Sequence, residues 1–382
     1  MDKKLSKLEL VKMEIEVTER KTNQKIKELG MQDQSLYTAL TTIQNLFNNI
    51  RNVPEESKLK YEKLKEIQVR WKQQADKIEA EFKNMEMKAV SMTAVGVGAG
   101  VTVAAMGPTA AMGVATTFGV ASTGTAISSL SGAAATNAAL AWLGGGALTV
   151  GGGGMAAGES LLLLAGPIGW GIAGISALTT LGVFFKGRED KKRLENIYTL
   201  IGERDVKSYK LAVVELSERI ARIQDESSKL INAISKIATF GTDYTMMTEE
   251  QQYELGAYVN LMEASTMLLV NPILGLQSKY TQHDFEQLCE DGCKSLIFVD
   301  LYLEKEIDYE VVRKEHEQLV MALANMLYKV PLDDKDRKLL IKSLKKDNGF
   351  LSSVNMSKHD LSTFDLVLID KALEYQYKAS RN

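Results

Sequence analysis

Residues 206–237, VKSYKLAVVELSERIARIQDESSKLINAISKI, carry the most regular pattern in the chain. Apolar or small side chains recur there at alternating steps of three and four residues, which is typical of a helix that buries one stripe. We predict a single helix from about residue 189 to 240, roughly 75 Å long at ~1.5 Å per residue. Its stripe consists of Val206, Tyr209, Val213, Leu216, Ile220, Ile223, Ser227, Leu230, Ile234 and Ile237.

The N-terminal region, residues 1–88, also predicts amphipathic helices. A first helix over 5–29 is expected to end at Gly30, because glycine suits the left-handed position after a helix. A second stripe follows at Leu36, Leu40, Ile43, Phe47 and Ile50. A third helix is expected to begin at Pro54, since proline is tolerated in a first turn, and to run unbroken to residue 88. Its stripe is Leu64, Ile67, Trp71, Ile78, Phe82 and Met85.

Residues 89–185 differ sharply in composition from the rest of the chain. These 97 positions hold one ionisable side chain, Glu159, and 21 of the 29 glycines in the chain. A sample is residues 135–158, ATNAALAWLGGGALTVGGGGMAAG. Because a spanning helix needs about 20 apolar residues, this apolar block has room for two or four crossings. In water, each interior glycine would weaken a helix by ~1 kcal/mol against alanine. We therefore predict membrane insertion, with a buried soluble core or a low-complexity linker as alternatives.

Three kinds of site residue are expected in and beside the apolar block. Small residues at four-residue spacing would let membrane helices pack closely. Glu159 lies in a turn, in a pore lumen, or is protonated and senses pH, because a carboxylate is costly at mid-bilayer. Aromatic and basic residues at its end would meet the lipid headgroups. The small residues are Gly96, Gly100, Ala104, Gly107, Ala111, Ala115, Gly119, Ala165, Gly169, Ala173 and Ala177, and the interface residues are Trp170, Phe184, Phe185, Lys186 and Arg188.

The expected fold class is all-α. Long helices flank the block, and laying them antiparallel is the simplest way to bury their stripes within one chain; an intermolecular coiled coil is the alternative. Beyond the block we expect the heptad helix within 186–241 and a small helical domain over 242–382. In that domain, Thr248 and Gln251 form a capping box, and Asn271 with Pro272 stops the helix.

Other functions find little support in the sequence. Residues 169–174, GWGIAG, match a dinucleotide fingerprint, but the charged helix that follows replaces the second strand that such a site needs. His283, Cys289, Cys293 and His316 have weak spacing for a metal site. Neither flank has the basic excess of a nucleic-acid binder. We expect no cofactor, no metal, no nucleic-acid partner and no enzymatic activity.

The layout resembles that of α-helical pore-forming proteins of the cytolysin A and haemolysin BL kind. The resemblance lies in the apolar block between long helices ending near Lys88 and beginning near Glu189. It implies a soluble form that hides the block, then inserts it into a lipid bilayer and assembles as a homo-oligomer. This chain has a longer block and no signal-peptide pattern, so we expect synthesis in the cytoplasm and membrane association afterwards.

The leading hypothesis is therefore a membrane-permeabilising protein, either a toxin or an intracellular effector of antiviral defence. The alternatives are a constitutive membrane-anchored scaffold whose C-terminal helical domain binds a protein partner, and a soluble helical structural protein.

Overall fold

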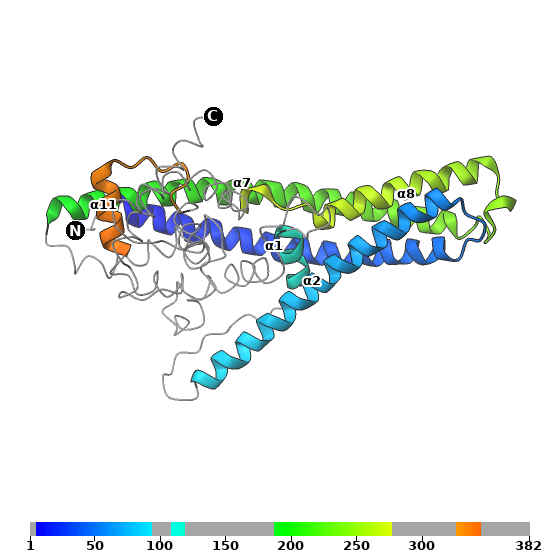
Figure 1. Ribbon diagram of the computed structural model, residues 1–382, viewed down its shortest axis with the longest axis horizontal. Coiled ribbons are helices and arrows are strands. Elements are labelled where there is room, and N and C mark those ends of the chain that lie inside the picture. Colours follow the sequence, from blue (N-terminus) through cyan, green and yellow to red (C-terminus); the bar gives the residue numbers. More distant parts are fainter. Residues whose placement is uncertain (1–4, 94–107, 119–186, 277–325, 345–382) are drawn as a thin grey trace, which may run out of the picture.

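The computed structural model describes residues 5–93, 108–118, 187–276 and 326–344 (Figure 1). Within these ranges the chain is helical and forms no strand, which confirms the all-α class for this part. The elements are α1 (Lys7–Asn48), α2 (Glu55–Thr93), α3 (Pro108–Phe118), α7 (Arg188–Ile237), η3 (Tyr244–Met246), α8 (Glu249–Val270), η4 (Leu274–Leu276) and α11 (Asp334–Leu344).

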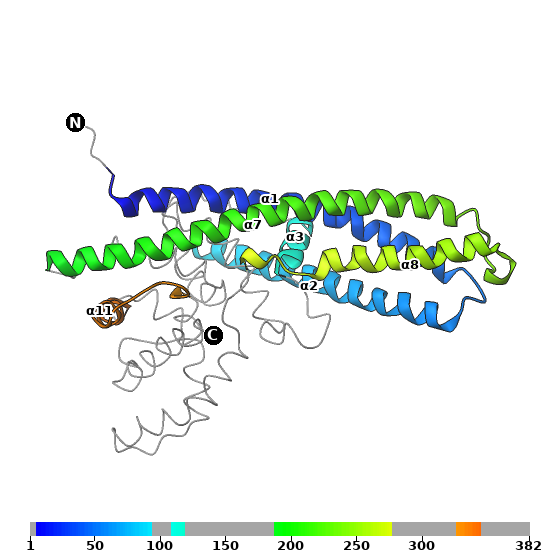
Figure 2. The same cartoon turned by 90° about the horizontal axis from the view of Figure 1, so that it is seen from above.

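Helices α1 and α7 pack along each other over most of the length of an elongated molecule, and they run in the same direction (Figures 1 and 2). Lys7 Nζ lies 2.8 Å from Glu203 Oε1, and Lys210 Nζ lies 2.6 Å from Glu14 Oε1, so both helices advance together. Most of the heptad stripe of α7 is buried, including Leu216, Ile223 and Leu230 at 0% exposure. The stripe therefore serves an intramolecular core.

The chain builds two helical hairpins, α1–α2 and α7–α8, that lie alongside each other. Helix α2 packs on α8 and runs parallel to it: Lys60 Nζ lies 2.9 Å from Glu263 Oε2, and Gln68 Nε2 donates to Thr266 Oγ1 at 2.9 Å. The expectation that the two helices flanking the block bury their stripes on each other was wrong. Although α2 and α7 run in opposite directions, α7 packs mainly on α1, whose buried side chains run from Leu8 to Phe47 along almost its whole length, while α2 packs on α3 and α8.

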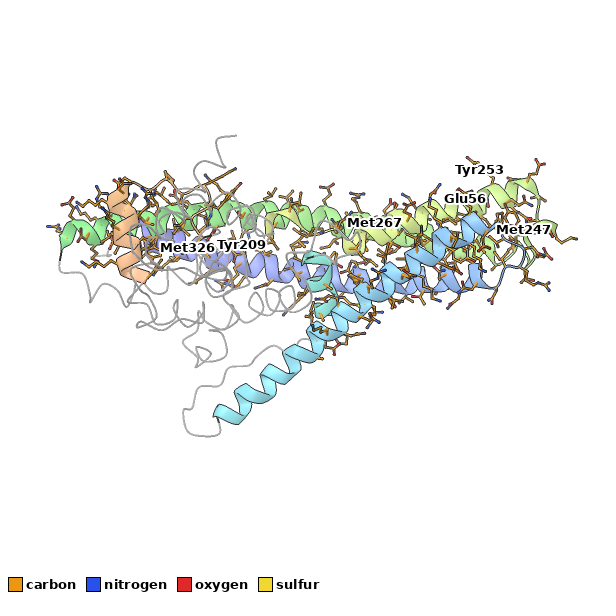
Figure 3. The ribbon with its side chains drawn as sticks, in the orientation of Figure 1. Glu56, Tyr209, Met247, Tyr253, Met267 and Met326 are labelled. Atoms are coloured by element: carbon orange, nitrogen blue, oxygen red, sulfur yellow. The ribbon has the colours of Figure 1, made fainter. Side chains whose placement is uncertain are left out.

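The turns of both hairpins meet at one tip of the molecule. Arg51 N donates to Thr242 O at 2.9 Å, and Tyr244 N donates to Arg51 O at 3.0 Å, which makes an isolated parallel bridge. Gly241, with φ of 83°, supplies the left-handed turn that follows α7. Figure 3 shows Met247 and Tyr253 at this tip, whereas Tyr209 and Met326 lie in the opposite half of the molecule.

Helix α1 does not stop at Gly30. It continues to Asn48, which corrects the prediction of two separate helices over this region. The physical reason is tertiary: Gly30 is the point at which α3 crosses α1, and the packing gained there offsets the ~1 kcal/mol that glycine costs inside a helix. All five residues of the predicted second stripe are buried, as expected; four lie in α1, Leu36, Leu40, Ile43 and Phe47, and Ile50 follows just after its end.

The predicted start of α8 is confirmed. Gln251 N donates to Thr248 Oγ1 at 3.2 Å, and Thr248 N donates to Gln251 Oε1 at 3.0 Å, which is a capping box. The helix ends at Val270, just before Asn271 and Pro272. However, α8 packs on α2, α3 and α7, so the segment just beyond the boundary expected at residue 242 belongs to the main bundle.

Candidate functional site

Helix α3 is the longer of two described pieces of the apolar block; the other is the last turn of α2. Its sequence, PTAAMGVATTF, has no ionisable side chain. It packs on α1, α2 and α8 near the middle of the molecule (Figure 2). Residues 110–117 are buried. The charged bundle thus encloses an uncharged helix, and we call the residues of α1, α2 and α8 that surround α3 the α3 seat.

The contact between α1 and α3 is made backbone to backbone. A Cβ added at Gly30 would lie 1.8 Å from Thr109 O, and one added at Gly113 would lie 2.0 Å from Ile26 O. Both distances are far shorter than any real contact, and the atoms met are backbone atoms that no rotamer change can move aside. Each helix therefore needs a glycine at the crossing.

Two hydrogen bonds tie the C-terminal end of α3 into the seat. The indole of Trp71, on α2 and fully buried, donates from Nε1 to Thr116 Oγ1 at 3.1 Å. Ile273 N, just after α8, donates to Thr117 O at 2.8 Å. The second bond satisfies one of the carbonyls left over at the end of a helix. α3 is thus held by three other segments of the chain.

Asp33 lies one turn beyond Gly30 on α1 and is completely buried. Neither carboxyl oxygen has a hydrogen-bond partner among the described residues. Burial raises the pKa of Asp33 well above its usual value, and the neighbouring Thr116 hydroxyl and the Arg219 guanidinium offset only part of the rise. An acid in this setting is favoured in its neutral form.

Arg219, on α7, is the cation that lowers the pKa of Asp33, but its hydrogen bonds go to other groups. Its Nη1 donates to Leu268 O at 2.6 Å and to Asn271 O at 2.8 Å. These carbonyls lie at the C-terminal end of α8, where a cation is favourably placed. Arg219 therefore fastens α7 to α8 and forms no ion pair with Asp33.

Two further buried acids lie on α1 and α7. Burial raises the pKa of Glu19 to about 7, and nearby Glu16 adds to the rise. Burial also raises the pKa of Asp205 to about 7, although Arg204 opposes it. Arg204 Nη1 additionally donates to the backbone oxygens of Met326 and Tyr328 at 2.7 and 2.8 Å, so this pair anchors the 326–344 segment.

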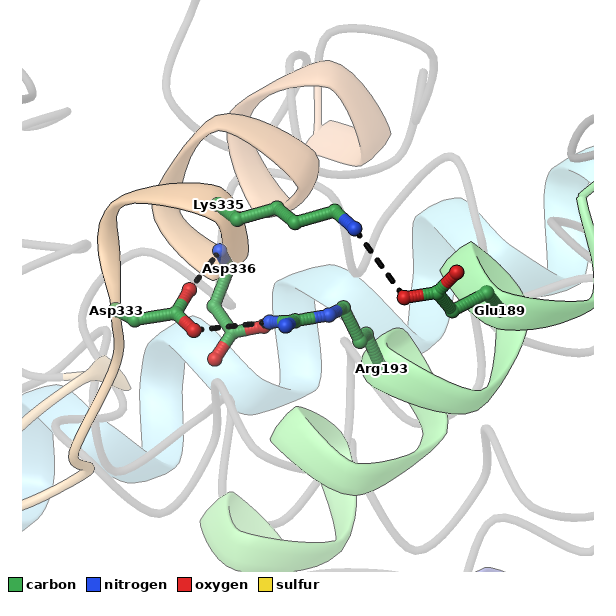
Figure 4. A network of polar contacts seen from close by, with 5 residues as sticks. All are labelled: Glu189, Arg193, Asp333, Lys335 and Asp336. Carbon is green, nitrogen blue, oxygen red and sulfur yellow. Dashed lines mark hydrogen bonds and ion pairs between the residues drawn. The ribbon is translucent and has the colours of Figure 1, made fainter.

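A second group of polar contacts holds α11 to the first turns of α7 (Figure 4). Arg193 Nη1 lies 3.0 Å from Asp333 Oδ2 and 2.6 Å from Asp336 Oδ1, and Lys335 Nζ lies 3.3 Å from Glu189 Oε1. We call these five residues the C-terminal clasp. It sits where the chain emerges from the apolar block.

The structure places three of the site residues expected from the sequence. Ala111 and Ala115 are buried in the α3 seat, and Arg188 is exposed as the first residue of α7. The others lie outside the described residues: Gly96, Gly100, Ala104, Gly107, Gly119, Glu159, Ala165, Gly169, Trp170, Ala173, Ala177, Phe184, Phe185 and Lys186.

Sequence reasoning missed the residues of the seat that come from outside the block. Asp33 nevertheless left a signal, because Leu29, Asp33, Leu36 and Leu40 follow one another at steps of four, three and four, so a carboxyl stands in an apolar stripe. For Trp71 the sequence predicted burial but no partner. Nothing in the sequence pairs Gly30 with Gly113.

The described ranges add little on metals and membranes. They contain no group of three or more His, Cys, Asp or Glu side chains that could hold a metal ion, and the four residues weighed for zinc lie outside them. One segment there, Glu249–Leu276, is long and apolar enough to cross a membrane, but 56% of its apolar window is buried in the bundle, as in the core helix of a soluble protein.

Comparison with known proteins gives no relative: no protein-family model, no curated protein and no solved structure matches this chain.

Proposed function

We propose that this chain is a non-enzymatic membrane-permeabilising protein whose helical bundle holds part of the apolar block until the block enters a bilayer. The observation that carries the proposal is the seating of α3. A helix without charge, from a block with one ionisable side chain in 97 positions, is packed inside charged amphipathic helices. The bundle gives α3 an apolar environment that a membrane could also supply.

The way in which α3 is seated supports the same proposal. Membrane helices associate through small residues that allow backbones to approach, because lipid removes the hydrophobic incentive. Gly113 makes such an approach to Gly30, with Ala111 and Ala115 buried beside it. The same face of α3 can therefore serve packing against α1 in the bundle and against another block helix in the membrane.

Unpaired polar atoms in the bundle support a form that rearranges. Among the described residues, the side chains of Asp33 and Gln44, Asn23 Oδ1 and Ser227 Oγ are buried without a hydrogen-bond partner. Each such atom costs about 1–3 kcal/mol. Undocking of α3 would let water reach Asp33, which offsets part of the cost of leaving the seat.

The proposal includes copies of the same chain and a lipid bilayer as partners. It places the biological role in toxin action or in intracellular defence, where a soluble form must first be made without harm to the cell. The block then crosses the membrane an even number of times, because basic residues flank both its ends and tend to remain on one side.

A dye-release assay with a pair of glycine variants tests the proposal. Gly30→Ala places a methyl group against the backbone of α3, whereas a Cβ added at Gly256, on α8, meets nothing within 4 Å. We expect the parent to release dye from anionic liposomes, Gly30→Ala to do so at lower protein concentration, and Gly256→Ala to match the parent. Gly30 lies outside the block, so its substitution leaves the inserting segment unchanged.

The proposal would be rejected if neither the parent nor any variant released dye over a range of pH and lipid composition. Constant recovery in the membrane fraction would then favour the scaffold, and constant recovery in the soluble fraction would favour a structural protein. If Gly30→Ala and Gly256→Ala leaked alike, the bundle would not be restraining the block through α3.

A further inference from the structure

We infer that Asp33 is a protonation-controlled latch for α3: the neutral carboxyl keeps α3 seated, and its ionisation expels the helix. The inference gives the proposed function a trigger, but the docking step itself takes place without a membrane.

The latch stands on the position of Asp33. It lies one turn beyond the Gly30–Gly113 crossing, at 0% exposure, beside Thr116 of α3. Thr116 also accepts the hydrogen bond from the Trp71 indole. The carboxyl and the indole thus reach the same residue of α3 from two different helices, so a charge on Asp33 acts directly where α3 is held.

The elements packed around Asp33 offer a carboxylate little compensation. α3 offers the Thr116 hydroxyl but no ionisable side chain, and the Trp71 indole of α2 donates to Thr116. The buried side chains of α8 include none that ionises. From α7 comes Arg219, whose guanidinium is bonded to the carbonyls at the end of α8 and is itself influenced by Glu215, Glu218 and Arg222.

An ionised Asp33 in this place would be a buried charge that only the Thr116 hydroxyl and the Arg219 guanidinium stabilise, and only in part, which is a costly arrangement in a protein. The chain can avoid it by keeping the proton or by letting water reach Asp33. Water can reach it if α3 leaves, because α3 is the uncharged element that covers this side of α1.

The direction of the pH effect follows from linkage. A raised pKa means that the seated form binds a proton that the released form loses, so seating is strongest at low pH and weakens as pH rises. Between the ordinary pKa of an aspartate and the raised value, each pH unit lowers the ratio of seated to released α3 about tenfold. Rising pH therefore releases α3.

Trp71 reports the latch without a membrane. The chain has three tryptophans, so Trp142→Phe and Trp170→Phe leave Trp71 as the single fluorophore in the full-length protein. With Asp33 present, we expect its emission to shift to longer wavelengths as pH rises from 5 to 9, while far-UV circular dichroism stays helical. In Asp33→Asn the emission should stay at short wavelength throughout. Asp33→Leu, which also carries no charge, should behave alike and covers the case in which the amide packs poorly.

Glu19→Gln is the matched control, because Glu19 is a buried acid of the same helix whose pKa is also raised, and the charged groups that influence it, Glu16 and Arg20, lie on α1 itself. It should show the pH-dependent shift of the parent. The latch is overturned if Asp33→Asn or Asp33→Leu folds and still shifts as the parent does, if Glu19→Gln removes the shift, or if the parent shows none. A shift that depends on Asp33 together with sealed vesicles would retain the latch and reject the permeabilising function. Leakage without such a shift would do the reverse.

Discussion

The α1–α7 pair and the α3 seat stabilise the molecule by opposite means. Between α1 and α7, large side chains such as Leu36, Leu40 and Leu216 fill a long seam at heptad spacing. At the seat, the absence of side chains at Gly30 and Gly113 lets the backbones of α1 and α3 come into contact. Because the seam between α1 and α7 is made of many contacts, the loss of one leaves the others in place. The seat depends on one crossing, so a change there can release the whole of α3. The difference suggests that the seam holds the bundle together while the seat can be emptied.

The largest effect is expected in the seam. Leu216→Ala removes a fully buried side chain, which should lower the free energy of unfolding by about 2–5 kcal/mol. Urea denaturation followed by circular dichroism measures it. Because the loss is global, Trp71 emission should change together with helix content. A separate, earlier Trp71 transition in this variant would show that the seam and the seat are not distinct.

The next largest effect is expected at Glu19, the buried acid of α1, and concerns the pH dependence of stability. Glu19 has a pKa raised to about 7 by burial, so its contribution is intact below its usual pKa and is lost as pH rises through 7. Glu19→Gln should remove this part of the pH dependence, on the order of 3 kcal/mol at most between pH 4 and 8. Thermal unfolding of both proteins across that range tests it, and parallel stability curves would contradict it.

A third prediction concerns a residue that the sequence assigned to membrane packing. Ala115 is 1% exposed in the seat, so Ala115→Leu should overpack it by about 1–3 kcal/mol and raise the red-shifted fraction of Trp71. The same change should weaken assembly in the membrane, where the small ridge is lost. Release without assembly is the expected combination; a tightly seated α3 in this variant would contradict the close packing.

The smallest effect is expected at the C-terminal clasp. Asp333, Lys335 and Glu189 are exposed and Arg193 is half-buried, and ion pairs this open to solvent add little to stability. Arg193→Gln should leave the unfolding midpoint nearly unchanged but speed proteolysis within residues 326–344, as should high salt in the parent. Equal cleavage rates in the two proteins would mean that the clasp does not hold α11.

The sequence by itself predicted where α7 runs and where α8 begins and ends, because helical periodicity, capping residues and proline act over a few neighbouring residues. The heptad stripe predicted α7, Thr248 with Gln251 located the start of α8, and Asn271 with Pro272 marked its end. The sequence also separated the apolar block from its charged flanks, since composition is a property of the chain alone.

Only the tertiary structure decided which helices lie together. The sequence predicted a helix end at Gly30 because glycine is common there, and it gave no sign that α3 packs against this glycine. Gly113 is 83 residues away, so the crossing leaves no local pattern. The parallel pairing of α1 with α7 likewise depends on the contacts each stripe finds. The role of Asp33 has the same origin: a carboxyl is ordinary in water, and its burial beneath α3 gives it an unusual pKa.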